Sequence, residues 1–410
     1  MDKIVTIAVL GGSHPHAELI KFLHAKGHRT ILIDYLDNPP AKSFADVHYQ
    51  ESSLDVEAVE RIARKESASY IMDICTDRAI PPAAYVAEKL HLSHPYSYET
   101  SLIATNKNKM KSFLQDANIP TSKFIQISTI EQICDICLEY PLIVKPSDAS
   151  GSIGITRVDN KESLKPSMEY ALQMSRNGQA IVEEYIDGVE IQMDCFVSDE
   201  HVHVLDIKEK RKYTRDKLTL SYGSLIPARI SDSQCNKCID ICNSIAQHLN
   251  ILNGPLYVQA IANNQNVYVI EFGLRFGGNL SFKILKDVCG VDIVSSSAEA
   301  YMGNEVRLSP QEAYDGVYAT YHIFPKEGVF KTITGFDNLL GDKTLEAFLI
   351  NKPSGIECEG NMTSKERLAS FIIRAKNIEE NNRKLQKVLD SVEVWDMSDN
   401  PIMRKDIYEL

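Results

Sequence analysis

Apolar runs alternate with amphipathic stretches along the first hundred residues. Residues 4–10 form an apolar run that ends at two glycines, and residues 16–28 then have the apolar spacing of a helix. The same succession of strand and helix continues at 30–34, 55–67, 70–75 and 83–90. Strands that alternate with helices at this spacing predict βαβ units and a parallel sheet, which closes near His94.

After residue 99 the pattern changes to strands in close succession. Helices interrupt them at three places, 103–122, 163–175 and 232–249. Strands that follow each other in pairs predict antiparallel sheets rather than a continuation of the first sheet. Beyond a further shift at 305–315, short strands alternate with helical segments that are predicted at 364–375 and 377–392.

Composition and charge limit the classes of protein. The chain has 410 residues, 44% of them hydrophobic, which predicts two or three folded domains. Its 44 basic and 56 acidic residues give a net charge of −12, which argues against a general binder of nucleic acids or anionic membranes. No apolar run approaches the roughly 18 residues that span a bilayer, and the first run is expected to be a strand rather than a signal peptide. The nine cysteines are expected to be reduced thiols of a cytoplasmic protein.

The first turn has the sequence GGSHPH at 11–16. A dinucleotide-binding turn needs Gly-x-Gly-x-x-Gly, and here two adjacent glycines are followed by Pro15. A tight strand-to-helix turn is therefore the favoured interpretation, and a loop that lines a substrate is the functional alternative. His14 and His16 are expected to be solvated loop histidines, although they could contact a substrate.

Two lysines and a loop of small residues are candidates for phosphate binding. Lys107 lies on a predicted helix, and Lys145 ends a buried strand. Residues 148–155 (DASGSIGI) follow at once, and small residues let backbone N–H groups approach phosphate oxygens. The loop lacks the spacing of a Walker motif, and an ordinary hairpin is the alternative.

Carboxylates and an amide make up the other candidate positions. Glu183 and Glu190 flank a Gly turn, where they could meet an adenine edge and ribose hydroxyls or simply be solvated. Gln259 and Glu271 can lie on adjacent antiparallel strands, where their oxygens suit Mg²⁺. Arg275 follows, where a fixed cation could hold a transferring phosphoryl group. The alternative is a buried Glu–Arg pair.

Taken in their order along the chain, these candidate lysines, the small-residue loop, the two glutamates and the Gln–Glu–Arg set resemble the ATP-grasp superfamily of ligases. The resemblance extends over nearly the whole chain. The resemblance implies an α/β and α+β fold with a Rossmann-like pre-ATP-grasp domain at 1–98, to which CTDRAIPP at 75–82 contributes. An ATP-grasp domain of two subdomains with antiparallel sheets is expected at 99–305, and a small C-terminal α+β domain at 306–410. The chain is most similar to the carboxylate–amine ligases that include amino-acid ligases, and more distantly to carbamoyl-phosphate synthase halves.

The resemblance also implies which residues contact ATP. Lys107 and Lys145 contact the phosphates, and Lys145 is in addition a catalytic cation. The flap over the γ-phosphate is expected at Ser150, Gly151, Ser152 and Gly154. The nucleoside contacts fall on Glu183, on the backbone near Ile186 and on Glu190.

Metal binding is implied for Gln259 and Glu271, with Mg²⁺ or Mn²⁺ as the ion, and Arg275 is expected to stabilise the phosphorylated intermediate. The sequence departs from the family at one place, because the family's Glu-x-Asn-x-Arg has Gly273 where the Asn ligand is expected. Glycine has no side-chain oxygen. Either Glu271 bridges both ions with extra waters, or one ion is bound more weakly.

The function that the resemblance implies is an ATP-dependent ligase that joins a small-molecule carboxylate to an amine through an acyl phosphate. Lysines, Arg275, loop N–H groups and Mg²⁺ would neutralise the repulsion between carboxylate and triphosphate. The alternatives are a carboxylation or carbamate-phosphorylating enzyme, which bicarbonate should stimulate, and a non-catalytic ATP-binding module. No nucleic-acid or membrane partner is expected, and a homodimer is among the states that the resemblance allows.

Two further clusters are weighed against simpler interpretations. Cys235, Cys238 and Cys242 share one face of the helix predicted at 232–249, which favours core packing over a metal site. The basic run at 208–217 is expected to be a solvated loop, with phosphate contact by Lys208 or Arg211 as the alternative.

Overall fold

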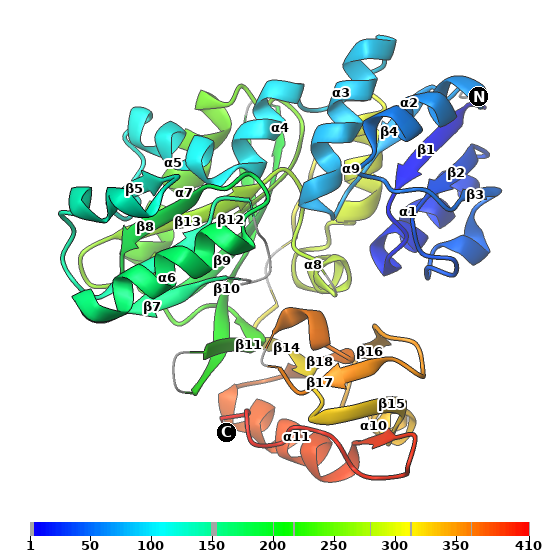
Figure 1. Cartoon of the computed structure of the whole chain (residues 1–410). Helices are drawn as coiled ribbons and strands as arrows, with labels where there is room; N and C mark the ends of the chain where they lie inside the picture. Colours follow the sequence, from blue (N-terminus) through cyan, green and yellow to red (C-terminus); the bar gives the residue numbers. More distant parts are fainter. Residues whose placement is uncertain are drawn as a thin grey trace.

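The computed structural model describes residues 4–148, 154–199, 201–215, 218–278, 280–311, 314–361 and 363–409. These residues form an N-terminal unit, a small antiparallel sheet with its helix, a large antiparallel sheet, and a C-terminal unit built onto that large sheet (Figure 1). No helix among the described residues is long and apolar enough to cross a membrane.

The N-terminal unit is a parallel sheet with the strand order β3-β2-β1-β4, as the alternating pattern predicts. The turn from the first strand into the first helix passes through Gly11, whose φ of +98° favours glycine. The strands are β1 (Thr6–Leu10), β2 (Arg29–Ile33), β3 (Val47–Tyr49) and β4 (Tyr70–Met72), and the helices are α1 (His14–Ala25), α2 (Val56–Lys65) and α3 (Ile80–Leu90).

One helix from late in the chain completes the N-terminal unit. α9 (Ile293–Tyr301) follows α8 (Ser281–Cys289) and packs against α1 and β4, as Figure 1 shows. Its Ile293 and Tyr301 are fully buried in one apolar cluster with Leu19 and Leu23 of α1. Residues near 300 are therefore part of the packing of the first sheet.

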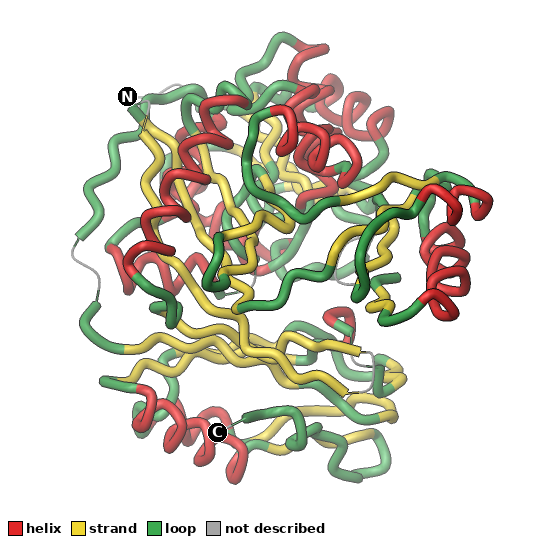
Figure 2. The backbone as a smooth tube through the Cα atoms, turned by 90° about the vertical axis from the view of Figure 1, so that its left-hand side faces the viewer, coloured by secondary structure: helices red, strands yellow, loops and turns green. Residues whose placement is uncertain are grey.

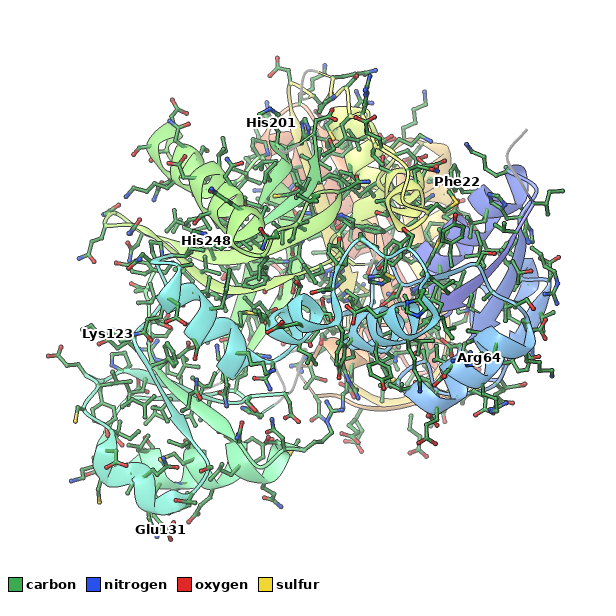
Figure 3. All side chains as sticks on the ribbon, turned by 90° about the horizontal axis from the view of Figure 1, so that it is seen from above. Phe22, Arg64, Lys123, Glu131, His201 and His248 are labelled. Atoms are coloured by element: carbon green, nitrogen blue, oxygen red, sulfur yellow. The ribbon has the colours of Figure 1, made fainter. Side chains whose placement is uncertain are left out.

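The small sheet is antiparallel, has the order β5-β8-β6-β7, and projects from the rest of the molecule. Seen from above, Lys123 and Glu131 mark this projecting unit, whereas Phe22 and Arg64 mark the N-terminal unit (Figure 3). Its elements are β5 (Phe124–Ile127), β6 (Leu142–Pro146), β7 (Thr156–Val158), α6 (Lys161–Met174) and β8 (Ala180–Glu184).

The large sheet has eight strands in the order β13-β12-β9-β10-β11-β14-β18-β16, all antiparallel. α7 (Asp232–His248) packs on it and buries Cys238 and Cys242, as the core interpretation predicts. The first five strands are β9 (Val189–Ser198), β10 (His201–Arg215), β11 (Leu218–Ile226), β12 (Gly254–Ala262) and β13 (Val267–Gly273).

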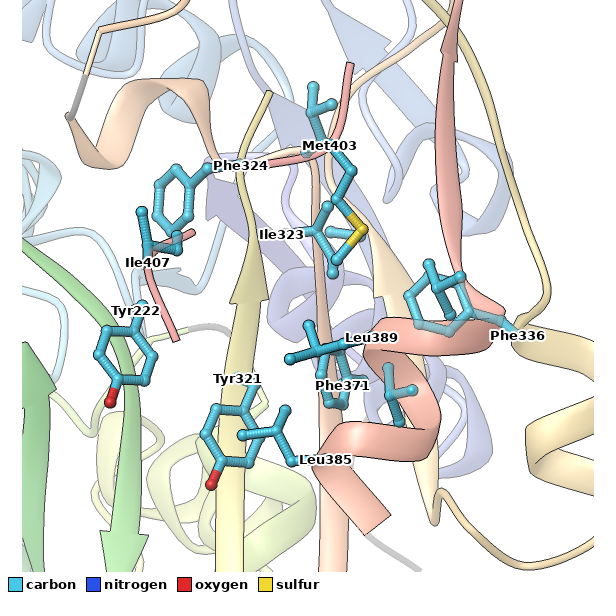
Figure 4. Packing of buried hydrophobic residues seen from close by; sticks show 14 of the residues in the cluster. Tyr222, Tyr321, Ile323, Phe324, Phe336, Phe371, Leu385, Leu389, Met403 and Ile407 are labelled. Atoms are coloured by element: carbon cyan, nitrogen blue, oxygen red, sulfur yellow. The ribbon is translucent and has the colours of Figure 1, made fainter. Parts of the chain in front are cut away.

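The C-terminal unit supplies the other three strands of the large sheet and a smaller sheet β17-β15-β19. Its helix α11 (Ile378–Ser391) lies beneath the strands in the side view of Figure 2, and Leu385 and Leu389 of that helix pack near Phe371 in Figure 4. The remaining elements are β14 (Val317–Ile323), β15 (Glu327–Thr334), α10 (Phe336–Gly341), β16 (Ala347–Ile350), β17 (Glu357–Glu359), β18 (Ala369–Ala375) and β19 (Glu393–Asp396).

Three predictions about elements were wrong. The helix predicted at 103–122 is two helices, α4 (Tyr98–Thr105) and α5 (Lys107–Asp116), because the Asn106 side chain accepts from two backbone N–H groups and begins a new helix. The segment 364–375 ends in strand β18, since its apolar residues are buried between two other strands. The basic run at 208–217 is no loop in its described part, which belongs to β10.

Candidate active site

Two strands of the small sheet bring a lysine and a glutamate together. Lys145 on β6 and Glu183 on β8 are buried, and the Lys145 Nζ lies 2.5 Å from Glu183 Oε1. Lys111 on α5 lies 2.7 Å from Glu183 Oε2, and the Ser122 hydroxyl donates to the same oxygen at 2.8 Å. Burial opposes the charge on Glu183, but the two lysines outweigh it and hold its pKa well below the ordinary value. The Glu183 carboxylate is bound to lysines in this structure. The adenine contact predicted for Glu183 stays a prediction.

Lys107 lies between this cluster and the large sheet. It is the first residue of α5, and its backbone N–H donates to the Ser147 carbonyl oxygen (3.1 Å), just beyond the end of β6. Burial lowers the pKa of Lys107, while the negative charge of Glu271 acts in the opposite direction and the positive charge of Lys145 adds to the lowering. Its ammonium therefore lies in the field of acidic groups from one sheet and of a lysine from the other.

The loop predicted to cover the γ-phosphate is described only at its end. Ser150, Gly151 and Ser152 lie outside the described residues. Gly154 has a φ of +73°, and a Cβ at this position would come within 2.6 Å of the Pro146 ring. A side chain at 154 would therefore be both strained and in collision with the end of β6.

Gln259 and Glu271 are direct neighbours on β12 and β13, as the sequence predicts. The Tyr257 hydroxyl donates to Glu271 Oε1 at 3.1 Å, and Gln259 Nε2 donates to Gln192 Oε1 at 3.5 Å. With its amide nitrogen turned to Gln192, Gln259 has its carbonyl oxygen left for an ion. Two half-buried oxygen donors on adjacent strands fit Mg²⁺, which takes its other ligands from water and phosphate.

Arg275 forms a bidentate ion pair with a residue of the N-terminal unit. Its Nε and NH2 donate to the two Asp77 carboxylate oxygens at 2.7 and 2.6 Å, and its guanidinium carbon lies 4.2 Å from the Tyr257 ring centroid. A Cβ at Gly273 would come within 2.3 Å of Tyr257 and 2.6 Å of Asp77 Oδ1. The place that the family fills with Asn is thus occupied by Tyr257 and Asp77.

Alternate residues of β10 form a row of lysines on one face of the large sheet. Lys208 is buried between Asp194 and Asp206, at 2.5 and 3.0 Å, which corrects the prediction of a solvated loop. Lys210 donates to Gln192 Oε1 at 2.6 Å, and burial together with the charge of Lys208 lowers its pKa to about 8. Lys212 pairs with Glu190, the residue predicted to hold the ribose.

The comparison with protein families is decisive for the domain. Residues 138–283, which include Lys145, Glu183, Gln259, Glu271 and Arg275, match the family model of the ATP-grasp domain. The chain carries an ATP-grasp domain. Members of this family are ATP-dependent ligases.

Other proteins resemble this chain over much of its length. The large chain of carbamoyl phosphate synthase from Clostridium acetobutylicum is 27% identical over 295 residues, which cover 68% of this chain but only 26% of that relative. The solved L-amino acid ligase from Bacillus licheniformis is similar with a TM-score of 0.83 and 19% identity, covering 97% of this chain and all of that one.

A third similar structure is the biotin carboxylase domain dimer of 2-oxoglutarate carboxylase from Hydrogenobacter thermophilus, in complex with MgADP, ADP and bicarbonate. It has a TM-score of 0.78 and 16% identity, and covers 98% of this chain and 92% of that one. At these identities the similarity to solved structures shows the fold of this chain and nothing beyond the fold.

The predicted nucleoside residues lie around the end of the small sheet and the start of the large one. Glu183 is at the end of β8, Ile186 follows in the half-buried connection, and Glu190 is in β9. The ATP-grasp domain therefore holds all three within one short stretch, and their contacts with adenine and ribose stay predictions.

Three residues of the site were missed in the sequence. Asp77 lies shortly after the carboxyl end of β4, which is where ligands meet parallel sheets. Lys111 is four residues after Lys107 on the same helix, so both project from one face. Lys210 belongs to the alternation Lys208, Lys210, Lys212, whose period of two is that of a strand.

One prediction about the first turn was also wrong. His16 is no solvated loop residue but is fully buried in α1, with Nε2 3.0 Å from Asp73 Oδ1. His14 is half-buried and contacts the Ile350 carbonyl oxygen at 3.3 Å.

Proposed function

We propose that the chain is an ATP-dependent ligase that joins a small carboxylate to an amine through an acyl phosphate. The position of Lys107 carries this proposal. Its backbone is bonded beside the end of β6, where Lys145 lies, and its ammonium lies in the field of Glu271 and Asp77. A polyphosphate placed at Lys107 would have cations of the small sheet on one side and oxygen ligands of the large sheet on the other.

The cations at this place suit phosphoryl transfer. A carboxylate approaching the γ-phosphate of ATP meets strong repulsion, and fixed positive charge lowers that barrier without any side-chain nucleophile. Lys145 is held by Glu183 and Arg275 by Asp77, so neither cation has to be ordered when substrate binds. Arg275 would face the transferring phosphoryl group.

Magnesium, when bound, would neutralise phosphate charge at Gln259 and Glu271. Gly273 supplies no ligand, and Tyr257 and Asp77 fill the space that an Asn side chain would need. The protein ligands for the ion are therefore these two side chains, and water and phosphate oxygens would complete the octahedron.

The second half of the reaction needs an amine and the exclusion of water. The amine attacks the acyl carbon and phosphate leaves, provided that the acyl phosphate is not hydrolysed first. The amine has to be unprotonated for this attack, because an ammonium group has no free electron pair.

A second candidate is a carboxylating or carbamate-phosphorylating enzyme. It is favoured by the similarity to the large chain of carbamoyl phosphate synthase, over 68% of this chain. That relative is about four times longer than the matched segment, since the match covers 26% of it. In this case bicarbonate would take the place of the carboxylate substrate, with the same cations around the phosphoryl group.

The test is ADP release from Mg-ATP in the presence of amino acids and small acids, with mass spectrometry for a condensed product. We expect release to depend on one carboxylate and one amine and not on bicarbonate. Bicarbonate-dependent release would favour the second candidate, and ATP binding without turnover across a broad panel would favour a non-catalytic module.

A matched pair of variants tests the site itself. Glu271→Gln should lower the rate of ADP release at least about 100-fold. The substitution removes the negative charge of a proposed magnesium ligand, and the ion would then stabilise the transition state less well. Glu357→Gln, the same change at an exposed position of β17, should leave release unaltered. Full turnover by a folded Glu271→Gln variant would contradict the assignment.

A further inference from the structure

A second group of reactive side chains lies in the N-terminal unit. His16 of α1 and Asp73, which follows β4, are completely buried, and Cys75 is partly exposed. One ligand or donor atom from each of the three lies within 4.8 Å of those of the other two. Ser13, the exposed residue that begins α1, lies beside them.

The contacts of His16 define the roles of its two nitrogens. Nε2 lies 3.0 Å from Asp73 Oδ1, while the Ser13 backbone N–H donates to Nδ1 at 3.2 Å. A nitrogen that accepts from an amide is unprotonated, so the proton of the neutral ring is on Nε2 and points to Asp73. Nδ1 is then the basic atom, with the Ser13 Oγ at 2.9 Å, and the Cys75 Sγ lies 3.6 Å from each of the two ring nitrogens.

Asp73 is built to orient this ring. Its Oδ1 also accepts from the backbone N–H groups of Cys75 and Thr76, which fixes the turn that carries the thiol. Its Oδ2 is buried and has no hydrogen-bond partner among the described residues. A buried carboxylate with spare acceptor capacity stabilises an imidazolium when one forms.

The His16 imidazole beside the Cys75 thiol binds a proton more strongly than a free histidine does. Burial alone would lower the pKa of His16, but the contacts with Cys75 and Asp73 outweigh it and raise that pKa to about 10. The Ser13 hydroxyl, at the start of α1, lies 3.5 Å from the sulfur. Burial lowers the pKa of the Arg275 guanidinium, but Asp77, Tyr257 and, as the smallest contribution, Cys75 outweigh it and raise that pKa above its ordinary value.

The thiol is also placed beside the proposed ligase chemistry. Asp77, two residues after Cys75, receives both hydrogen bonds from Arg275, the cation expected at the phosphorylated intermediate. The turn that carries the sulfur thus also holds the cation that faces the acyl phosphate.

From this geometry we propose that Cys75, with His16 as base and Asp73 as positioning residue, is a nucleophilic thiol that accepts an acyl group from an acyl phosphate. The substrate class rests on the proposed function. The thiol proton moves to His16 Nδ1, and the sulfur attacks the acyl carbon. A C–S bond forms, and the C–O bond to phosphate breaks with its electron pair, so that phosphate leaves. The amine then attacks the thioester, the C–S bond breaks, the sulfur recovers the proton from His16, and the proton of the amine goes to solvent.

The test uses acetyl phosphate, which needs neither ATP nor the unknown carboxylate. After incubation at neutral pH, peptide mass spectrometry should find one acetyl group on Cys75, removable by hydroxylamine, and none on Cys134 or Cys137. Both of these cysteines are exposed and serve as controls within the same molecule. Iodoacetamide should alkylate Cys75 at least about tenfold faster than Cys134, because a neighbouring base supplies thiolate.

Variants separate a chemical role from a structural one. His16→Gln should reduce both reactions at Cys75 to the level of Cys134, whereas Asp73→Glu should retain more of them than Asp73→Asn. Far-UV circular dichroism and melting temperature check that each variant is folded. The proposal is overturned if wild-type Cys75 takes up no acetyl group, or if a folded His16→Gln variant labels as fast as wild type. A failure of the proposed ligase function would instead show as absent ADP release, which this test does not involve.

Discussion

The neighbours of Gly273 lie so close to it that they explain why this position has no side chain. The Tyr257 ring and the Asp77 carboxylate fill the volume into which a Cβ would project, and both are fixed, Tyr257 by Glu271 and Asp77 by Arg275. The Asp77 partner of Arg275 therefore occupies part of the space beside position 273, and a larger side chain cannot be added there without displacing Tyr257 or Asp77.

Gly273→Asn should destabilise the protein by about 1–3 kcal/mol, because the new atoms overlap Tyr257 and Asp77. Urea denaturation would measure the change. Gly341→Asn is the control, since nothing lies within 4 Å of a Cβ at position 341. Equal stability of the two variants would show that Tyr257 and Asp77 move aside at little cost in free energy, which contradicts the prediction.

Glu183 should contribute stability that depends on pH. Its pKa is lowered from the ordinary value of 4.5 in the folded protein, so the contribution is complete above that value and is lost as the pH falls from there towards the folded pKa. Glu183→Gln leaves two buried lysines unpaired and should cost about 3 kcal/mol at pH 7.

The measurement is the free energy of unfolding of wild type and Glu183→Gln in urea, from neutral to acidic pH. The difference should stay constant down to about pH 5 and shrink below the ordinary pKa of a glutamate. A difference that grows with acidity would mean that Glu183 is not the charged partner of Lys111 and Lys145. Glu357→Gln, at an exposed position, should show no difference at any pH.

At the scale of elements, capping decides where Lys107 lies. Asn106 accepts from the backbone N–H groups of Asn108 and Lys109, and this separates α4 from α5. Apolar periodicity runs through the junction, so the pattern alone predicts one helix. The sequence does show an Asn before a lysine-rich turn, which is a possible helix start. Whether that start interrupts one long helix depends on how the two shorter helices pack, and the sequence pattern alone does not show this.

Asn106→Ala should cost about 1 kcal/mol and should also weaken ATP binding several-fold, because Lys107 is the first residue of the helix that Asn106 begins. Asn377→Ala is matched to it, since Asn377 caps α11 by accepting from the Glu380 N–H. The control should lose similar stability with unchanged nucleotide affinity, measured by isothermal titration calorimetry. If both variants bind ATP with the same affinity, the proposed contact of Lys107 with the phosphates is contradicted.

Other elements depended on partners that are distant in sequence. β1, β2 and β4 were predictable because each is a short apolar run that an amphipathic helix precedes or follows. The segment 364–375 has charged residues at its start and no clear period, and only pairing with β14 and β16 makes its end a strand. The lysines of β10 are similar, because their charge suggests a solvated loop until Asp194 and Asp206 are placed beside Lys208.

At the scale of the whole molecule, the large sheet continues from the ATP-grasp strands into the C-terminal unit through the pairing of β11 with β14. The predicted boundary at 305/306 therefore separates chain segments that share one sheet. Sequence order identified Lys145, Gln259, Glu271 and Arg275 as candidates. It could not identify Asp77 as the partner of Arg275, because that contact joins residues that are 198 positions apart.

Hydrogen exchange should show this continuity. In mild urea, we expect the backbone amides of β11 and β14 to exchange together, because opening one strand removes the hydrogen bonds of the other. Mass spectrometry of peptides from 218–226 and 317–323 would measure both rates. Exchange of the whole segment 306–410 while β11 stays protected would mean that the C-terminal unit opens independently.

The crowding at Gly273 also limits the order in which this chain could change over evolutionary time. A mutation to Asn at that codon meets Tyr257 and Asp77 immediately, whereas loss of Asp77 leaves Arg275 without its carboxylate. A lineage that acquired the asparagine would first have to find another anion for the guanidinium. In the present arrangement, a single substitution at either Gly273 or Asp77 is therefore expected to lower the stability of the protein.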